Sequence, residues 1–191
     1  MKTIFYIYLL LVLFSCEEKN VIESGKSIYD YNSNEITGGN SPVMINISEK
    51  DEVVYKVKCD SLISFKENIL LYDNVDIEIF SENIKSTNLL SDKAEIKGSA
   101  ENSGRKTHYN FSNADMIAEG NVTITSYERN DRLLTNKIML YNNNRCNILI
   151  DTAESVTFIM DTDTMRGFGF ESDCEMKNWK ILKPAGVIYN K

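Results

Sequence analysis

Few side chains in this sequence of 191 residues have the types and spacing that catalysis or metal binding requires. The single histidine, His108, alternates with Tyr109 and Phe111, a pattern typical of a solvent-facing strand residue rather than of a general base. Asp161 and Asp163 lie in a turn that lacks the glycine and the terminal glutamate of an EF-hand. The sequence has no glycine-rich phosphate loop and no nucleophile elbow. We therefore expect a protein that is not an enzyme and that uses no cofactor and no metal.

Cys16 is the residue whose setting predicts a covalent modification. Lys2 precedes 11 apolar residues at positions 4–14, a run typical of a secretory signal and shorter than the roughly 20 residues of a membrane span. Residues 13–16, Leu-Phe-Ser-Cys, are similar to a bacterial lipobox, in which the cysteine is diacylated on its sulfur and becomes the new N-terminus. Two or three acyl chains would hold the protein stably on a membrane. A plain signal peptide with a chance cysteine is the alternative.

The rest of the chain divides into a tether and one domain. Residues 16–40 are polar and rich in turn-forming types, which predicts a lipidated tether, and residues 41–191 have the length of a single domain. The formal net charge of −7 argues against binding of nucleic acid. We interpret Cys59, Cys146 and Cys174 as small buried side chains, with one disulfide as the alternative.

Alternation with a period of two dominates residues 41–191. Apolar side chains occupy every second position in several segments, for example 75–79, 122–125 and 156–159, and turn-forming residues separate these segments. No stretch after residue 16 keeps a helical apolar rhythm for three turns. The sequence therefore predicts an all-β domain.

An internal pattern recurs in which a small or polar pair containing Asp or Asn precedes an alternating strand. The copies begin 32, 44 and 36 residues apart and cover 57–64, 89–96, 133–140 and 169–176. This recurrence favours stacked layers of two or three strands. Amphipathic strands that each follow a turn would give the same pattern.

Several phrases in a fixed order make the chain similar to the LptC family, the periplasmic component of the lipopolysaccharide exporter, within the LptA/LptC/OstA-like superfamily. The phrases are Leu89–Ile96, Asp115–Ile124, Leu134–Tyr141 and Met165–Asp173, the last followed by Met176–Trp179. The resemblance covers roughly residues 40–182. The chain departs from the family at its start, where the lipobox replaces a spanning helix.

The resemblance implies an open V-shaped β-jellyroll, a folded-over antiparallel sheet with an apolar trough for lipopolysaccharide. Each acyl methylene kept out of water is worth about 0.8 kcal/mol, so a lipid that crosses the periplasm needs apolar cover. A purely structural role in the core is the alternative for every trough residue. Alternation assigns these residues to the trough: Val75, Ile77, Ile79, Ala94, Ile96, Tyr109, Phe111, Val122, Ile124, Leu134, Ile138, Leu140, Ile148, Ile150, Val156 and Phe158.

The resemblance also implies docking by strand addition at two open sheet edges. The N-terminal edge would pair with LptF/LptG-type transporter subunits, and the C-terminal edge with an LptA-like jellyroll. Trp179 is alternatively a core residue, and the two glycines alternatively mark a bulge or bend. The expected docking residues are Val53, Tyr55 and Val57 at the first edge and Gly167, Gly169, Lys177, Trp179 and Ile181 at the second.

Two functions are consistent with these features. The first is a bridge that accepts lipid A from an inner-membrane ABC transporter and passes it on, in the periplasm and lipid-anchored to the inner rather than the outer membrane. The second is a periplasmic or surface lipoprotein that serves as a passive β-scaffold or ligand-binding module. Glu17 and Glu18 directly after Cys16 favour the second, because acidic residues there direct some lipoproteins outward.

Overall fold

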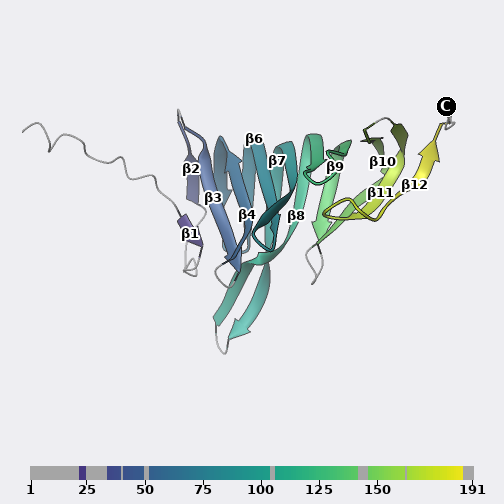
Figure 1. Cartoon of the computed structure of the whole chain (residues 1–191). Helices are drawn as coiled ribbons and strands as arrows, with labels where there is room; N and C mark the ends of the chain where they lie inside the picture. Colours follow the sequence, from purple (N-terminus) through teal and green to yellow (C-terminus); the bar gives the residue numbers. More distant parts are fainter. Residues whose placement is uncertain are drawn as a thin grey trace, which may run out of the picture.

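The computed structural model describes residues 22–24, 34–39, 41–49, 52–103, 106–141, 146–161 and 163–186. Throughout these ranges the regular structure is β, which confirms the predicted fold class (Figure 1). The strands are β1 (Ile22–Ser24), β2 (Asn34–Thr37), β3 (Val43–Glu49), β4 (Glu52–Cys59), β5 (Ser61–Ser64), β6 (Asn68–Ser81), β7 (Ile84–Ser103), β8 (Lys106–Ser126), β9 (Arg132–Tyr141), β10 (Asn147–Ile159), β11 (Thr164–Asp173) and β12 (Trp179–Ala185).

The 12 strands form one open sheet. Its main path runs β1-β3-β4-β6-β7-β8-β9-β10-β11-β12, while β2 pairs with β5 and β5 pairs with β6. All pairings are antiparallel except that of β1 with β3. The strands at the two ends of this path do not pair with each other, so the sheet does not close into a barrel (Figure 1).

Irregularities at one level of successive strands fold the sheet over. The register shifts lie between Tyr72 and Val75 in β6, and the neighbouring strands shift at 90–93, 119–122 and 150–155. Such bulges bend a strand and increase its twist. We call this line the crease. It separates half-sheet A (β2, β5 and residues 68–72, 93–97, 115–119, 137–141, 147–150 and 170–173) from half-sheet B (β3, β4 and residues 75–81, 84–91, 122–126, 132–135, 155–159 and 164–168).

Short polar side chains stabilise the crease. Asn74 Nδ2 donates to Asp60 Oδ2 at 2.7 Å, and Asn121 Nδ2 donates to Asp92 Oδ2 at 2.9 Å. Asp and Asn accept turn-like backbone conformations and make local hydrogen bonds there. The recurrent sequence pattern therefore marks the crease in its first three copies, at Asp60, Asp92 and Asn136. In the fourth copy the polar pair lies at the end of β11 instead.

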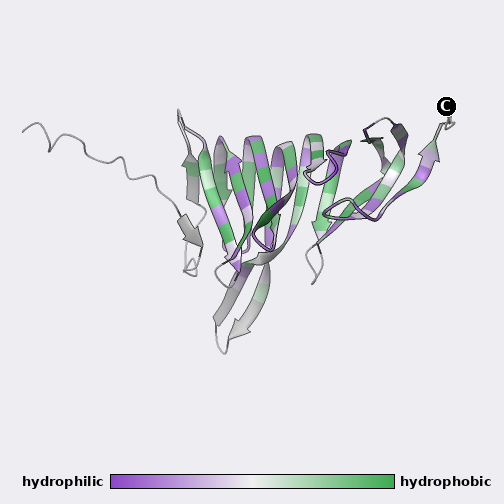
Figure 2. Cartoon of the chain, viewed as in Figure 1, coloured by the Kyte–Doolittle hydropathy of each residue, from purple (hydrophilic) through white to green (hydrophobic). Residues whose placement is uncertain are grey.

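The core lies between the two half-sheets, whose inner faces carry the apolar side chains. Figure 2 shows hydrophobic and hydrophilic residues alternating along the strands, as expected for a sheet with one buried face. The residues with 0% exposure include Leu71, Ile77, Leu89, Ile96, Leu133, Phe158, Phe170 and Met176.

The sheet begins before residue 41, where the sequence predicted the end of a tether. β2 pairs with β5, and β1 pairs with β3, although both strands fall within residues 16–40. Ile36 packs against the core, and its burial, together with the pairing to β5, favours the position of β2 on the sheet. Cys16 and the predicted signal peptide lie outside the described residues.

Candidate functional site

The inner face of the folded sheet is the first candidate site. Cross-strand register places its residues in rows; one row in half-sheet B joins Leu89, Ile124, Leu133 and Phe158. Residues paired in register share a face, so each row gives a continuous apolar strip. Lipid contact stays a prediction. The trough residues that the structure buries are Val75, Ile77, Ile79, Ala94, Ile96, Val122, Ile124, Ile138, Leu140, Ile148, Ile150, Val156 and Phe158.

Leu134 faces outward, so its assignment to the trough is wrong. Its side chain is 36% exposed, whereas that of Leu133 is 0% exposed. Leu133 lies opposite Ile124 and Phe158, and the next residue of a strand points to the other face. Two adjacent leucines leave the facing of a strand undetermined in the sequence, and Leu90, beside the buried Leu89, is another exposed case.

Tyr109 and Phe111 lie at the border of the interior. Both side chains are half-buried. Beyond residues 97 and 115, where half-sheet A ends, β7 and β8 continue as a long hairpin (Figure 1). A Cβ placed on Gly98 would lie 3.1 Å from Tyr109 Cβ and 3.1 Å from Phe111 Cε1. The two aromatic residues therefore cover Gly98 on the facing strand, where there is no side chain to keep them away.

The trough prediction missed several equally buried residues. Phe170 of β11 is 0% exposed and pairs in register with Ile150. The alternation that predicted the other trough residues would have found most of them if continued into the neighbouring strands. The further buried residues include Leu62, Leu71, Leu89, Met116, Ala118, Leu133 and Phe170.

The N-terminal edge lies elsewhere than predicted. β4, with Val53, Tyr55 and Val57, is an interior strand between β3 and β6. Tyr55 and Val57 are 2% and 1% exposed, and burial with the nearby Asp115 raises the pKa of the Tyr55 hydroxyl. The prediction is wrong because a tight hairpin, Glu49 to Glu52, returns β4 alongside β3. The main path ends at β1, which pairs with residues 45–47 of β3, and β2 is the end strand beside β5.

The C-terminal edge is β12, which pairs with β11 and with no other described strand. Trp179 and Ile181 belong to this strand, as predicted. Lys177 precedes it, and Gly167 and Gly169 lie one strand further in, so these three are not edge residues.

The two glycines adapt β11 to its neighbours. Gly169 has a φ of +69° and faces the four-residue excursion of β10 between Ile150 and Ser155. A Cβ on Gly167 would lie 2.5 Å from the Lys183 carbonyl oxygen. A bulge and a close backbone approach therefore account for both positions.

Trp179 closes the interior at the start of β12. Its ring centroid lies 4.7 Å from that of Phe158 and 6.4 Å from that of Phe170. Such aromatic clusters stabilise a core beyond their buried area. Trp179 is thus part of the core packing, the alternative that its sequence position had left open.

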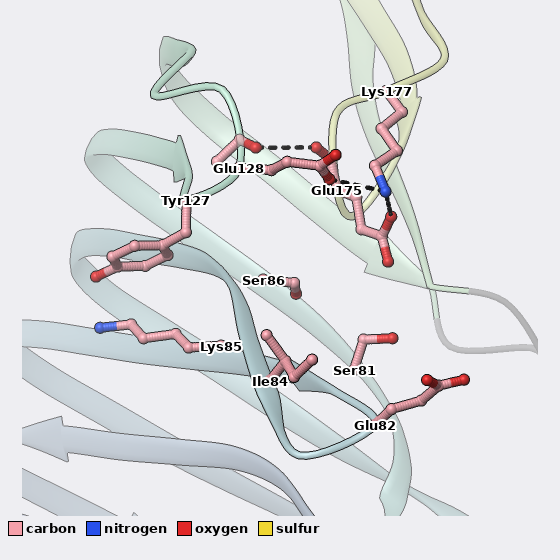
Figure 3. A pocket seen from close by; sticks show the side chains of 10 residues that line it. Ser81, Glu82, Ile84, Lys85, Ser86, Tyr127, Glu128, Glu175 and Lys177 are labelled. Carbon is pink, nitrogen blue, oxygen red and sulfur yellow. Dashed lines mark hydrogen bonds and ion pairs between the residues drawn. The ribbon is translucent and has the colours of Figure 1, made fainter.

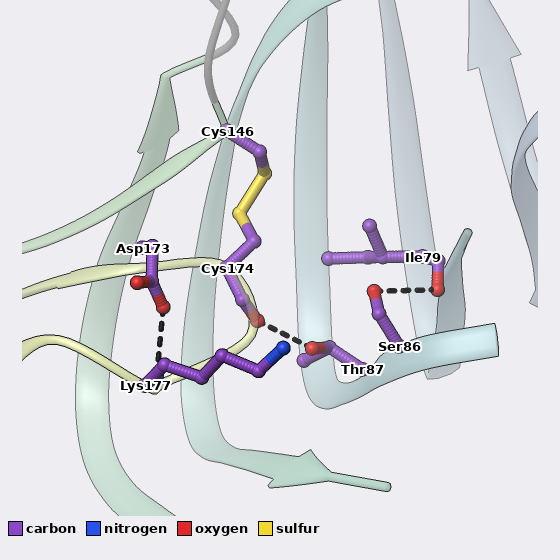
Figure 4. Close-up of a disulfide and its surroundings, with 7 residues drawn as sticks. All are labelled: Ile79, Ser86, Thr87, Cys146, Asp173, Cys174 and Lys177. Atoms are coloured by element: carbon purple, nitrogen blue, oxygen red, sulfur yellow. Dashed lines mark hydrogen bonds between the residues drawn. A yellow bond between two sulfur atoms is a disulfide. The ribbon is translucent and has the colours of Figure 1, made fainter. Parts of the chain in front are cut away.

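A short segment spans the side of the molecule opposite the crease. We call this side, where the tips of the two half-sheets face each other, the mouth, and residues Cys174–Asn178 the strap. Thr87 Oγ1 of half-sheet B donates to the Cys174 carbonyl (Figure 4). Ser126 Oγ donates to the Glu175 carbonyl at 3.1 Å. Arg129 donates to the Met176 carbonyl. The strap thereby joins the end of β11 to the far half-sheet.

A disulfide between Cys146 and Cys174 fastens the strap to half-sheet A, with the two Cα atoms 5.3 Å apart (Figure 4). The interpretation of all cysteines as separate buried side chains is therefore wrong for this pair. The register explains the bond, because Asn147 and Asp173 are paired at the tips of β10 and β11. Cys59 is free and buried, and burial raises the pKa of its thiol to about 11.

A cleft lined by Lys85, Tyr127, Glu128, Glu175 and Lys177, among other residues, lies beside the strap (Figure 3). Lys177 Nζ lies 2.8 Å from Glu128 Oε2 and 2.7 Å from Glu175 Oε2, and these hydrogen bonds raise the pKa of Lys177. Lys85 lies 2.6 Å from a carboxylate oxygen of Glu78. Since both lysines already have carboxylate partners, this cleft offers little attraction for an anion.

The described residues contain no candidate metal centre, and comparison with known sequences identifies no family. Within the described ranges, no group of His, Cys, Asp or Glu side chains could hold a metal ion, and none of the segments is a helix able to cross a membrane. No family model and no curated protein matches the sequence. The case for a function therefore rests on the fold, the inner face and the edges.

Proposed function

We propose that this chain is a periplasmic, membrane-anchored carrier module of lipopolysaccharide export. It accepts lipid from an inner-membrane ABC transporter of the LptF/LptG type and passes it to an LptA-like jellyroll. The observation that carries the proposal is an open sheet, folded over once, whose inner face is apolar over the rows of both half-sheets. The disulfide between Cys146 and Cys174 fits an exported protein, since such bonds persist in oxidising compartments.

The interior suits acyl chains because the sheet is folded about one line, the crease, and is not closed on the opposite side by strand pairing. The rows of half-sheet A pack against those of half-sheet B, and the 12 strands are not closed into a ring. Acyl chains would enter as the half-sheets separate about the crease, replacing contacts between side chains by contacts with methylenes. Each buried methylene returns about 0.8 kcal/mol, which offsets the lost packing.

The free edge of β12 supports a docking role. An unpaired strand edge presents backbone N–H and C=O groups on which another strand can form hydrogen bonds. Pro184 in β12 lacks an N–H, which limits such pairing to one part of the strand. An LptA-like jellyroll added here would continue the inner face of this domain into its own.

The anchor is tested by replacing Cys16. The Cys16→Ala variant is expected to leave the membrane fraction and appear in the soluble periplasmic fraction, because acyl chains on Cys16 supply the anchoring. Wild-type chain fractionated in parallel is the control. Full membrane retention of the variant would contradict a lipid anchor.

The bridge and the passive lipoprotein are separated by two measurements in cells. Affinity purification of the anchored chain is expected to recover transporter subunits, and protease added to intact cells is expected to leave the chain uncut. Recovery of no transporter subunit, with cleavage by external protease, would instead support a surface lipoprotein, as Glu17 and Glu18 would suggest.

A further inference from the structure

Three buried polar side chains, Thr87, Ser126 and Ser172, lie at the mouth. Thr87 and Ser126 are paired in register at the tip of half-sheet B, and both are 0% exposed. Ser172 lies at the tip of half-sheet A, in a row with Ile148 and Trp179, and is 7% exposed. Hydroxyl groups from both half-sheets therefore border the apolar interior at this place.

Two of these hydroxyls are occupied by the strap and one is not. Thr87 and Ser126 donate to the backbone carbonyls of Cys174 and Glu175. Ser172 Oγ has no hydrogen-bond partner among the described residues. A buried hydroxyl without a partner is unfavourable and uncommon, so it calls for an acceptor that a ligand can bring.

We propose that the mouth binds the carbonyl-bearing root of an acyl chain, and that the strap holds this site closed by presenting its own peptide carbonyls there. The methylenes of the ligand lie in the apolar interior, and its ester or amide carbonyl accepts a hydrogen bond from the unpartnered Ser172 hydroxyl of half-sheet A. The Thr87 and Ser126 hydroxyls of half-sheet B are further donors once the strap carbonyls leave them. This inference rests on the proposed function, and it adds the place at which an acyl chain enters and the segment that controls it.

The strap is attached to the two half-sheets by bonds of different strength. Its link to half-sheet A is covalent, through Cys146, whereas its links to half-sheet B are hydrogen bonds from Thr87, Ser126 and Arg129. Arg129 is itself held by the buried Asp131, at 2.8 Å. Separation of the half-sheets breaks the hydrogen bonds and frees the Thr87 and Ser126 hydroxyls for the ligand.

The test compares two amphiphiles of equal chain length on the full chain. Decanoyl-N-methylglucamide has an amide carbonyl at the root of its chain, and decyl glucoside has an ether oxygen instead. Trp179, the single tryptophan, pairs in register with Ser172 and reports binding through its fluorescence. The variants are Ser172→Ala, Cys146→Ser with Cys174→Ser, and all three changes together.

The hydroxyl of Ser172 is expected to act on the amide ligand alone. The Ser172→Ala variant loses roughly five- to tenfold in affinity for decanoyl-N-methylglucamide, the effect of one hydrogen bond, and keeps its affinity for decyl glucoside. Ser91→Ala is the matched control. Ser91, on β7, is buried like Ser172, but its hydroxyl already donates a hydrogen bond to the Lys93 carbonyl. Equal loss for both ligands, or no loss for either, would overturn the proposal.

Loosening the strap is expected to strengthen binding. The double cysteine variant binds the amide ligand on the order of tenfold more tightly than wild type, because the strap, no longer fixed to Cys146, can leave the Thr87 and Ser126 hydroxyls without separation of the half-sheets. Cys59→Ser controls for general destabilisation, since it changes a buried cysteine remote from the strap. Unchanged affinity in the double variant would refute the proposal that the strap holds the mouth closed.

The outcomes also separate this inference from the proposed function. If both amphiphiles bind and neither Ser172 nor the strap affects them, the interior accepts acyl chains and only the mouth site is wrong. If no variant binds either amphiphile, the interior does not accept acyl chains, and both proposals fail.

Discussion

The crease and the mouth hold the two half-sheets together in different ways. The crease depends on local contacts between adjacent strands, such as that of Asn121 with Asp92 at 2.9 Å. The mouth depends on contacts between distant parts of the chain, such as that of Thr87 with Cys174, 87 residues apart. A hinge built from local bulges folds with the strands themselves, whereas the mouth closes only once the sheet is complete.

This difference suggests a division of roles. Backbone geometry fixes the crease, so it sets the angle and direction of folding. One disulfide and a few hydrogen bonds from side chains to carbonyls hold the mouth, so it is the place where opening needs the fewest changes. The comparison predicts that changes at the mouth and at the crease differ in size and kind.

The largest expected effect is loss of the disulfide at the mouth. The Cys146→Ser, Cys174→Ser variant should lose about 3 to 4 kcal/mol of unfolding free energy, as expected for a loop of 28 residues. Urea unfolding followed by Trp179 fluorescence measures the loss. Cys59→Ser should lose less unfolding free energy. An equal loss in both variants would show that the disulfide at the mouth stabilises the fold no more than a buried free cysteine does.

The next effect is expected at the crease. Gly120 has a φ of +80°, and a Cβ there would collide with the Asp92 carboxylate, so Gly120→Ala should cost about 2 kcal/mol of unfolding free energy. Gly39→Ala is the matched control, because Gly39 has a φ of +61° but nothing within 4 Å of the added Cβ.

The Gly39→Ala variant isolates the backbone strain, and adding Asp92→Ala to Gly120→Ala should recover the part due to the collision. Equal denaturant midpoints for the two single glycine variants would show that the packing of Gly120 against Asp92 does not matter to the crease.

The smallest effect concerns charge on the outer surface beside the crease. Glu119 accepts hydrogen bonds from Lys137 at 2.5 Å and Lys93 at 2.7 Å, which lower the pKa of its carboxyl to about 2. The ionised form is therefore favoured in the folded state. Its contribution is complete above the usual glutamate pKa of about 4.5 and is lost as the pH falls from there towards 2.

The Glu119→Gln variant should thus be less stable than wild type at pH 7 by under about 1 kcal/mol, because the groups are partly exposed. The difference should vanish near pH 2, measured by urea unfolding across this range. A Lys93→Met, Lys137→Met variant should reproduce the effect. A difference that persists unchanged at pH 2 would exclude ionisation of Glu119 as the cause.

The features of the fold that depend on a local sequence pattern could be predicted. Alternation predicted the strands and most of the inner face, and the recurrent Asp and Asn pattern marked the crease at Asp60 and Asp92 without revealing its role. Alternation failed at Leu133 and Leu134, because two adjacent leucines do not indicate which of them points to the interior. The order of strands at the N-terminal edge depends on which hairpin forms, and that is not a local property.

The mouth could not be predicted for the same reason. The three cysteines at positions 59, 146 and 174 allow several pairings, and the one between Cys146 and Cys174 follows from the tips of β10 and β11 lying side by side. The strap has no period or motif, and its residues gain their role only through Thr87 and Ser126 on distant strands.

The most direct test of the central claim is photo-crosslinking to lipopolysaccharide in growing cells. A photoreactive phenylalanine analogue is placed at the inward Phe158 or Phe111, or at the outward Thr123 or Glu78. The account predicts a lipopolysaccharide adduct from the two inward positions and none from the outward ones. Equal labelling from both faces, or labelling from the outer face alone, would contradict a lipid-carrying interior.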